Sequence, residues 1–121
     1  MKLKLAHGNW AELKEAEDIT VNESEDLMAI ALWSREEPSR AALALRMYAA
    51  AVIEVWSYGV DVPVLSVNDG VPTLAWIEAF GKMPVMGFNQ ILNHALSVVN
   101  KVAPSFEPTP DTTSPTSPSI D

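Results

Sequence analysis

The sequence contains no cysteine, so neither a disulfide framework nor a thiolate zinc site can stabilise the fold. Histidine is also scarce, since only His7 and His94 occur in 121 residues. The sequence has no His-x-x-x-His or Glu-x-x-His spacing and no glycine-rich loop that could cradle a phosphate. It therefore predicts neither a metal site nor a bound cofactor.

The same scarcity argues against catalysis. Nucleophilic catalysis needs a serine, cysteine or threonine beside a base that a third group orients. His7 falls in an expected turn and His94 on the flank of an expected helix, so neither has such a partner in the pattern. The acidic residues between Glu15 and Asp26 lack the alternating oxygen ligands and central glycine of a calcium loop, and we interpret them as a solvated face at a helix start. We expect no enzymatic activity and no catalytic residue.

Positive charge is limited, because eight Lys and Arg stand against sixteen Asp and Glu and give a net charge of −8. Binding to a phosphate backbone needs clustered cations, so nucleic acid is not an expected partner. The longest apolar stretch, residues 41–58, carries Arg46 and Glu54 and only reaches the lower limit of the ~17–25 residues that span a bilayer. No apolar run of signal-peptide length follows Lys2 and Lys4. We expect a soluble protein with no membrane segment and no secretion.

The N-terminal segment, residues 1–21, predicts a short β-hairpin and a connection. Leucines alternate with lysines over residues 2–5, and His7-Gly8-Asn9 supplies turn residues before Trp10. A two-stranded unit is marginal alone in water, so we expect it to lie on the helices through Trp10 and Leu13. Residues 11–16 could equally form a helix.

Two helices are predicted over the centre of the chain. Asn22 or Ser24 can cap the first, which we expect to run to about Trp33. Pro38 suits the first turn of the second, which we expect to continue to Gly59 with apolar residues around most of its circumference. It is the predicted central helix.

In the rest of the chain, proline- and glycine-containing segments that interrupt helices alternate with segments of helical pattern. Residues 60–68 indicate an extended connection or an edge strand, closed by the turn Asn68-Asp69-Gly70. A short helix is expected from about Thr73 to Phe80, and a last one has apolar residues at three- and four-residue steps from Phe88 to Val102. The predicted fold class is thus mainly α: a small bundle of about four helices in one domain, residues 1–102, followed by a disordered Pro/Ser/Thr-rich tail, residues 103–121.

Large amphipathic side chains are the clearest candidates for function. Four tryptophans occur in the chain, and tryptophan is frequent where one end of a side chain is buried and the other contacts a partner. The segment from residue 76 to 88 stays apolar across Gly81 and Pro84, and flexible methionines there suit an adaptable docking surface. The alternative is a corner packed against the central helix. The candidate protein-binding residues are Trp10, Trp76, Phe80, Met83, Met86 and Phe88.

The stretch Gly8-Asn9-Trp10-Ala11-Glu12-Leu13, followed by Glu17-Asp18-Ile19-Thr20, resembles the opening of small tail-module proteins of long-tailed bacteriophages. These proteins include tail assembly chaperones. The resemblance implies a non-enzymatic protein of the infected host's cytoplasm that holds the tape measure protein and recruits tail tube subunits.

We therefore expect a protein-binding chaperone of phage tail assembly, and a homo-oligomer is compatible with that role. The alternative is a structural component of the virion, such as a head-tail connector or a minor tail protein. Either role requires side chains that bind another polypeptide, and neither requires a catalytic site.

Overall fold

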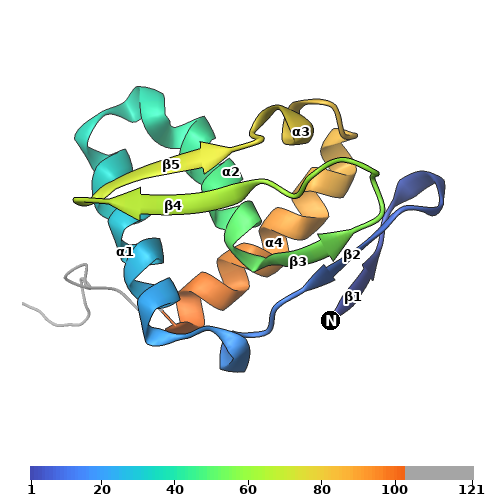
Figure 1. Cartoon of the computed structure of the whole chain (residues 1–121), viewed down its shortest axis with the longest axis horizontal. Coiled ribbons are helices and arrows are strands. Elements are labelled where there is room, and N and C mark those ends of the chain that lie inside the picture. Colours follow the sequence, from blue (N-terminus) through green and yellow to red (C-terminus); the bar gives the residue numbers. More distant parts are fainter. Residues whose placement is uncertain (103–121) are drawn as a thin grey trace, which may run out of the picture.

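The computed structural model describes residues 1–102, and the tail expected over residues 103–121 lies outside this part of the chain. The fold is mixed α/β, so the prediction of a mainly α bundle was wrong. Within the described residues, five strands form two antiparallel sheets, one in the order β1-β2-β3 and one of β4 and β5 (Figure 1). The strands are β1 (Lys2–Lys4), β2 (Trp10–Leu13), β3 (Ile53–Trp56), β4 (Val64–Asn68) and β5 (Val71–Ala75). The α-helices are α1 (Val21–Glu36), α2 (Ala41–Val52), α3 (Glu78–Gly81) and α4 (Val85–Val102).

The N-terminal hairpin is confirmed, with β1 antiparallel to β2 and Leu3 opposite Ala11. A 3-10 turn, Ala6–Gly8, joins the strands. Ala11 and Leu13 point to the same face of β2, and both are fully buried. The hairpin is therefore anchored to the core through alternate residues of β2.

Helix α1 begins two to four residues earlier than expected, because Thr20 and not Asn22 or Ser24 is its N-cap. The Thr20 hydroxyl accepts a hydrogen bond from the backbone N–H of Glu23, and the Glu23 carboxylate accepts one from the N–H of Thr20. This capping box satisfies two backbone donors that the helix start would otherwise leave free. Leu27 and Ile30 are buried on the inner face of this helix.

The expected central helix is replaced by a helix and a strand. Pro38–Arg40 form a 3-10 turn, α2 ends at Val52, and Ile53 takes an extended conformation (φ −84°, ψ 124°). Residues 52–56 are apolar enough for either state, and their β-branched side chains suit a strand once β2 offers an open edge. In β3 the side chains of Ile53 and Trp56 are buried, whereas Glu54 and Val55 are exposed.

The helix expected from Thr73 to Phe80 is also wrong over most of its length. Residues 71–75 form β5, in which Pro72 lies opposite Val67 of β4. Proline is tolerated there because a two-stranded sheet has only edge strands. Only the last turn, α3, is helical, and Trp76 and Ile77 separate it from β5.

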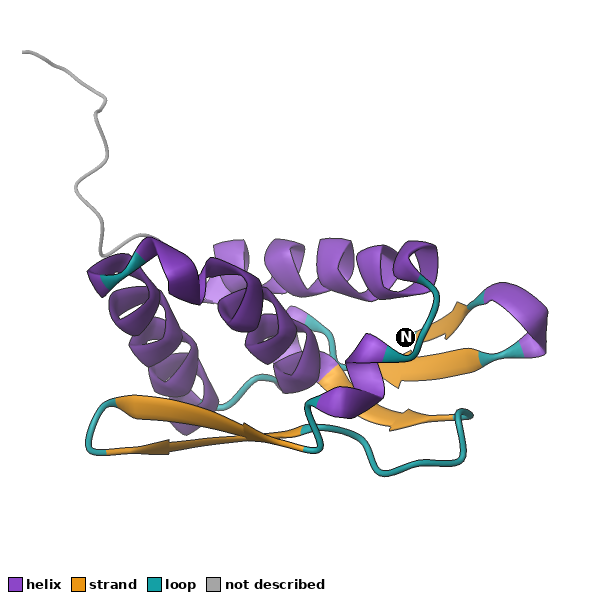
Figure 2. Cartoon of the chain, turned by 90° about the horizontal axis from the view of Figure 1, so that it is seen from above, coloured by secondary structure: helices purple, strands orange, loops and turns teal. Residues whose placement is uncertain are grey.

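The last helix is confirmed as an amphipathic helix. Its polar face is exposed, and its apolar face packs against α2. The exposed polar residues are Asn89, Asn93, Ser97 and Asn100. Figure 2 shows α4 on one side of the molecule and the β4–β5 hairpin on the other, with α1 and α2 between them. No helix within residues 1–102 is both long and apolar enough to cross a membrane.

The core has two clusters of buried side chains. One joins the three-stranded sheet to α2, α3 and α4, and the other lies between α1 and α2. Tyr48, Leu74 and Val102 pack against both clusters, so the two are continuous.

Candidate functional site

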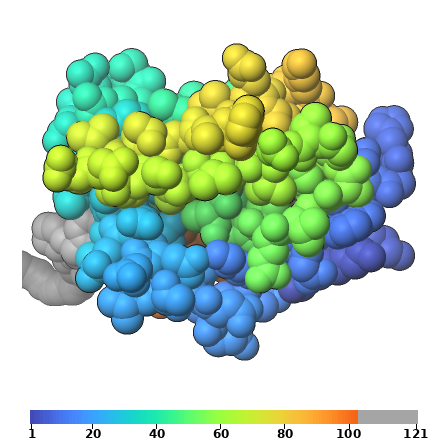
Figure 3. Space-filling model, viewed as in Figure 1, coloured from blue at the N-terminus to red at the C-terminus, as the bar shows by residue number. Residues whose placement is uncertain are grey.

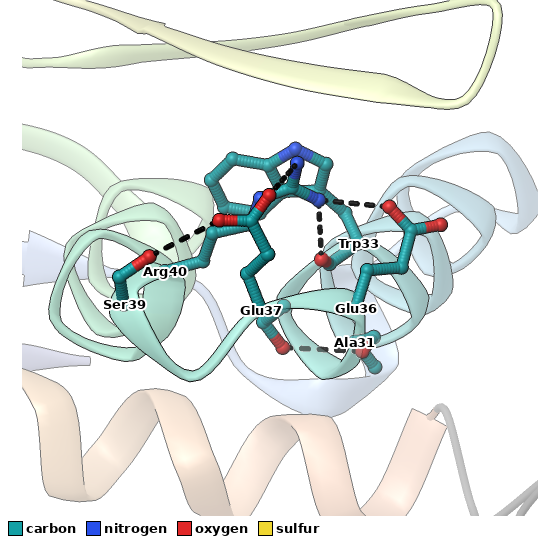
Figure 4. Close-up of polar contacts among 7 residues, drawn as sticks. Ala31, Trp33, Glu36, Glu37, Ser39 and Arg40 are labelled. Carbon is teal, nitrogen blue, oxygen red and sulfur yellow. Dashed lines mark hydrogen bonds and ion pairs between the residues drawn. The ribbon is translucent and has the colours of Figure 1, made fainter.

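Two of the four tryptophans serve the structure. Trp56 is 7% exposed, and its indole N–H donates to the carbonyl oxygen of Val60 at 2.8 Å. The Trp33 ring lies under the guanidinium of Arg40, whose carbon is 4.7 Å from the ring centroid (Figure 4). Arg40 also donates to the carbonyl oxygen of Trp33 and to the Glu36 carboxylate, both at 2.8 Å. These contacts fix the connection between α1 and α2.

The other two tryptophans differ in exposure. Trp10 on β2 is partly buried, and the Lys2 ammonium lies 4.6 Å from the centroid of its ring. Trp76 is 59% exposed and joins β5 to α3. Of the four, Trp76 presents the largest apolar surface to a partner.

The backbone of Trp76 is strained, since its φ is +62°. A residue with a Cβ in this left-handed region carries a penalty of about 1–2 kcal/mol relative to a normal helical or extended conformation. The Trp76 carbonyl oxygen accepts the N–H of Ala79 at 3.0 Å, which begins the turn of α3. Glycine would satisfy this geometry without strain, so the chain holds an exposed aromatic ring at a position that favours glycine.

A groove of about 660 Å³ lies beside Trp76. One wall comes from the loop after β3 and the other from α3 and the residues that follow it. The lining residues are Tyr58, Gly59, Val60, Asp61, Trp76, Glu78, Ala79, Lys82 and Met83. Val60 on the opposite wall is 56% exposed, so the groove has an apolar residue on each side.

A second groove, of about 330 Å³, borders the same segment, α3 and the residues that join it to α4. Met83 lines both grooves. Its outer rim includes Leu45 of α2 and Val85 of α4. Val85 and the neighbouring Met86 are 68% and 76% exposed. We call Val60, Trp76, Met83, Val85 and Met86 the corner surface.

The interior beneath the corner surface is aromatic. Phe80 is 4% exposed, and its ring packs edge-on against Trp56 at 5.8 Å and Phe88 at 5.2 Å between centroids. The Arg46 side chain of α2 donates to the carbonyl oxygen of Ile77 at 3.4 Å and ties the corner to that helix. The segment that carries Trp76 is therefore held by packed aromatic side chains and by the hydrogen bond from Arg46.

The six candidates from the sequence therefore separate into three groups. Trp76, Met83 and Met86 belong to the corner surface. Phe80 and Phe88 pack beneath it, and Trp10 lies in the three-stranded sheet, outside both grooves. Val60 was not predicted, because a single valine beside Gly59 gives no signal of its exposure. Val85 lies within the predicted apolar segment, residues 76–88, but was not among the six candidates.

Neither histidine lies in these grooves. The Nε2 of His94 is 2.8 Å from the carbonyl oxygen of Lys14, a structural contact between α4 and the segment after β2. His7 is exposed in the turn between β1 and β2. Within residues 1–102, no three His, Asp or Glu side chains gather closely enough to hold a metal ion.

The chain matches none of the protein-family models, curated proteins or solved structures with which it was compared.

Proposed function

We propose that this protein is a non-enzymatic chaperone of phage tail assembly that holds the tape measure protein and recruits tail tube subunits in the host cytoplasm. The observation that carries the proposal is Trp76, an exposed ring on a strained backbone that lines the groove of about 660 Å³. Strain and exposed apolar surface both reduce stability, and such features recur where binding requires them. The resemblance of residues 8–20 to tail-module proteins supplies the class of partner.

The corner surface suits reversible burial of an apolar helical stripe. Trp76 and Met86 supply large, exposed side chains, and the unbranched Met83 can adjust to different clients. The net charge of −8 would keep such a complex soluble while apolar surface is buried. The client would be released when the tail tube polymerises around it.

The decisive variant is Trp76→Gly, tested with the purified tape measure protein from the same genome. Removing a central aromatic residue should weaken binding at least about tenfold. Glycine relieves the left-handed strain, so the melting temperature should not fall. Leu32→Ala is the matched control, because Leu32 is 53% exposed on α1 and lies outside both grooves. Calorimetric titration and thermal unfolding of the three proteins give both quantities.

Unchanged binding by Trp76→Gly, or an equal loss with Leu32→Ala, would contradict the proposal. A large fall in the melting temperature of Trp76→Gly would show that the ring serves the fold. Mass spectrometry of purified virions separates the alternative role: a chaperone is absent from the particle, whereas a connector or minor tail protein is present in fixed copy number.

A further inference from the structure

A cleft separate from the two grooves lies on a different part of the surface, between α1, β3 and the start of β4. It encloses about 270 Å³ and appears in Figure 3 as the hollow between the blue atoms of α1 and the green atoms of β3. The lining residues are Lys14, Ile19, Glu23, Asp26, Leu27, Ala50, Ala51, Ile53, Glu54, Val62, Pro63, Val64 and Leu65. It shares no residue with either groove of the corner surface.

The rim of this cleft carries more negative than positive charge. Three carboxylates, from Glu23, Asp26 and Glu54, face one ammonium, from Lys14. Lys14 is committed to Glu23, since the two side chains form an ion pair at 2.6 Å. Within residues 1–102, neither Asp26 nor Glu54 forms an ion pair or a side-chain hydrogen bond, although Glu54 interacts electrostatically with the Met1 ammonium. Asp26 is therefore the rim carboxylate whose charge no cation of the described residues offsets.

The interior of the cleft is apolar. Leu27, Ala50 and Ile53 are buried, whereas Ile19, Ala51, Val62 and Leu65 are partly exposed and present apolar surface to the cleft. An apolar interior under an acidic rim suits a long aliphatic stem with a cationic end, which only lysine and arginine combine among the common side chains.

The ionised carboxylate of Asp26 does not stabilise the fold. Partial burial raises the pKa of its carboxyl group, and the negative charges of Glu23 and Glu25 raise it further. A carboxyl whose folded pKa is raised lowers stability at neutral pH, where it is ionised. A cation from outside the chain would compensate this charge.

We propose that the cleft is a docking site for a lysine or arginine side chain presented by a protein partner. The aliphatic stem lies on Ala51 and Leu65, and the cationic head lies between Asp26 and Glu54. Charge complementarity selects this occupant, because an acidic rim repels nucleic acid and acidic peptides. The site acts independently of the corner surface, so a partner can contact both or either one.

The test uses the full chain labelled with nitrogen-15 and blocked five-residue peptides of alternating valine and threonine around one central residue. Peptides with central arginine or lysine should shift the amide signals of Asp26, Glu54 and Leu65. Peptides with central norleucine or glutamate should not. The double variant Asp26→Asn with Glu54→Gln should weaken binding of the arginine peptide by about tenfold.

A matched double variant controls for total charge. Asp61→Asn with Glu78→Gln removes the same two charges from the groove beside Trp76 and should leave the affinity unchanged. An equal loss in this control, shifts spread over the whole acidic surface, or tighter binding of spermidine than of the peptides would overturn the proposal. Asp26→Asn should melt at the same or a higher temperature, so lost binding cannot be ascribed to unfolding.

The Trp76→Gly variant separates the two sites. It should bind the arginine peptide like the unmodified chain while losing the tape measure protein. If Trp76→Gly still binds the tape measure protein, the proposed chaperone role is contradicted but the cleft proposal is not. If the cleft binds no basic peptide, the cleft proposal is contradicted but the chaperone role is not.

Discussion

Glu23 is the residue on which the polar contacts at the start of α1 converge. Its carboxylate accepts hydrogen bonds from the Lys14 ammonium at 2.6 Å, from the Thr20 N–H at 2.9 Å and from the Thr20 hydroxyl at 3.2 Å. The bond from Lys14, followed by the backbone bond from Thr20, lowers the pKa of the Glu23 carboxyl. The same side chain thus caps α1 and ties the segment after β2 to it.

A lowered carboxyl pKa in the folded state makes a stability contribution that depends on pH. The contribution is present above the unfolded-state pKa of about 4.3 and is lost as the pH falls through the lower folded value. Glu23→Gln should therefore reduce the free energy of unfolding by about 0.5–1 kcal/mol at pH 7, because the pair is partly exposed. The difference should shrink towards zero near pH 3. Urea unfolding at both pH values measures it.

Glu17→Gln is the control for that measurement, since Glu17 is exposed in the 3-10 turn before α1 and forms no such contact within residues 1–102. Its unfolding free energy should match that of the unmodified chain. If Glu23→Gln were equally destabilised at pH 3 and pH 7, its effect would come from packing and not from charge.

At the scale of elements, the sequence predicted α1 and α4 well because their signals are local. α4 has an unbroken helical period with a polar face, and α1 has a capping residue within two positions of the expected one. The strands β3 and β5 were missed for a different reason. An apolar run such as residues 52–56 fits a helix or a strand, and only the presence of β2 in space decides between them.

The candidate site shows the same limit. Composition alone identified Trp76, Met83 and Met86, but it could not separate them from Phe80, which has the same character and lies inside. The cleft was beyond prediction, because Asp26 and Glu54 are far apart in the sequence and line one cleft only in the folded chain. The acidic start of α1 was interpreted as a solvated face, and the structure places part of it on a cleft.

The β4–β5 hairpin depends on its turn, in which Asp69 and Gly70 both have positive φ, +53° and +78°. Two such residues form the tight turn that matches the twist of paired strands. Gly70→Ala should lower the free energy of unfolding by about 1 kcal/mol, because the added Cβ meets no other atom and only the left-handed conformation is penalised.

Gly81→Ala provides the comparison for this hairpin variant. Gly81 has no positive φ, and its nearest neighbours are side-chain atoms of Arg46 at 3.7 and 3.8 Å from the added Cβ. Alanine at the end of α3 should be neutral or slightly stabilising. Chemical denaturation of both variants tests the difference, and similar losses would show that the turn conformation is not what limits the hairpin.

The molecule as a whole presents two proposed binding surfaces of different chemistry on one continuous core. The corner surface is apolar and lies where α3 meets α4, whereas the cleft is acidic and lies beside the start of α1. α2 contributes to the core beneath both, because it packs against α1 and α4. A small acidic protein arranged in this way can hold an apolar client at one place and a basic segment at another.

The central claim is that the corner surface binds the client. The most direct measurement is the amide spectrum of the full chain, labelled with nitrogen-15, during titration with a purified helical segment of the tape measure protein. The account predicts shifts in the Trp76 indole signal and in the amides of Lys82 and Met86, with little change in the β1–β2 hairpin. Unshifted signals at these three residues in a saturated complex would contradict it.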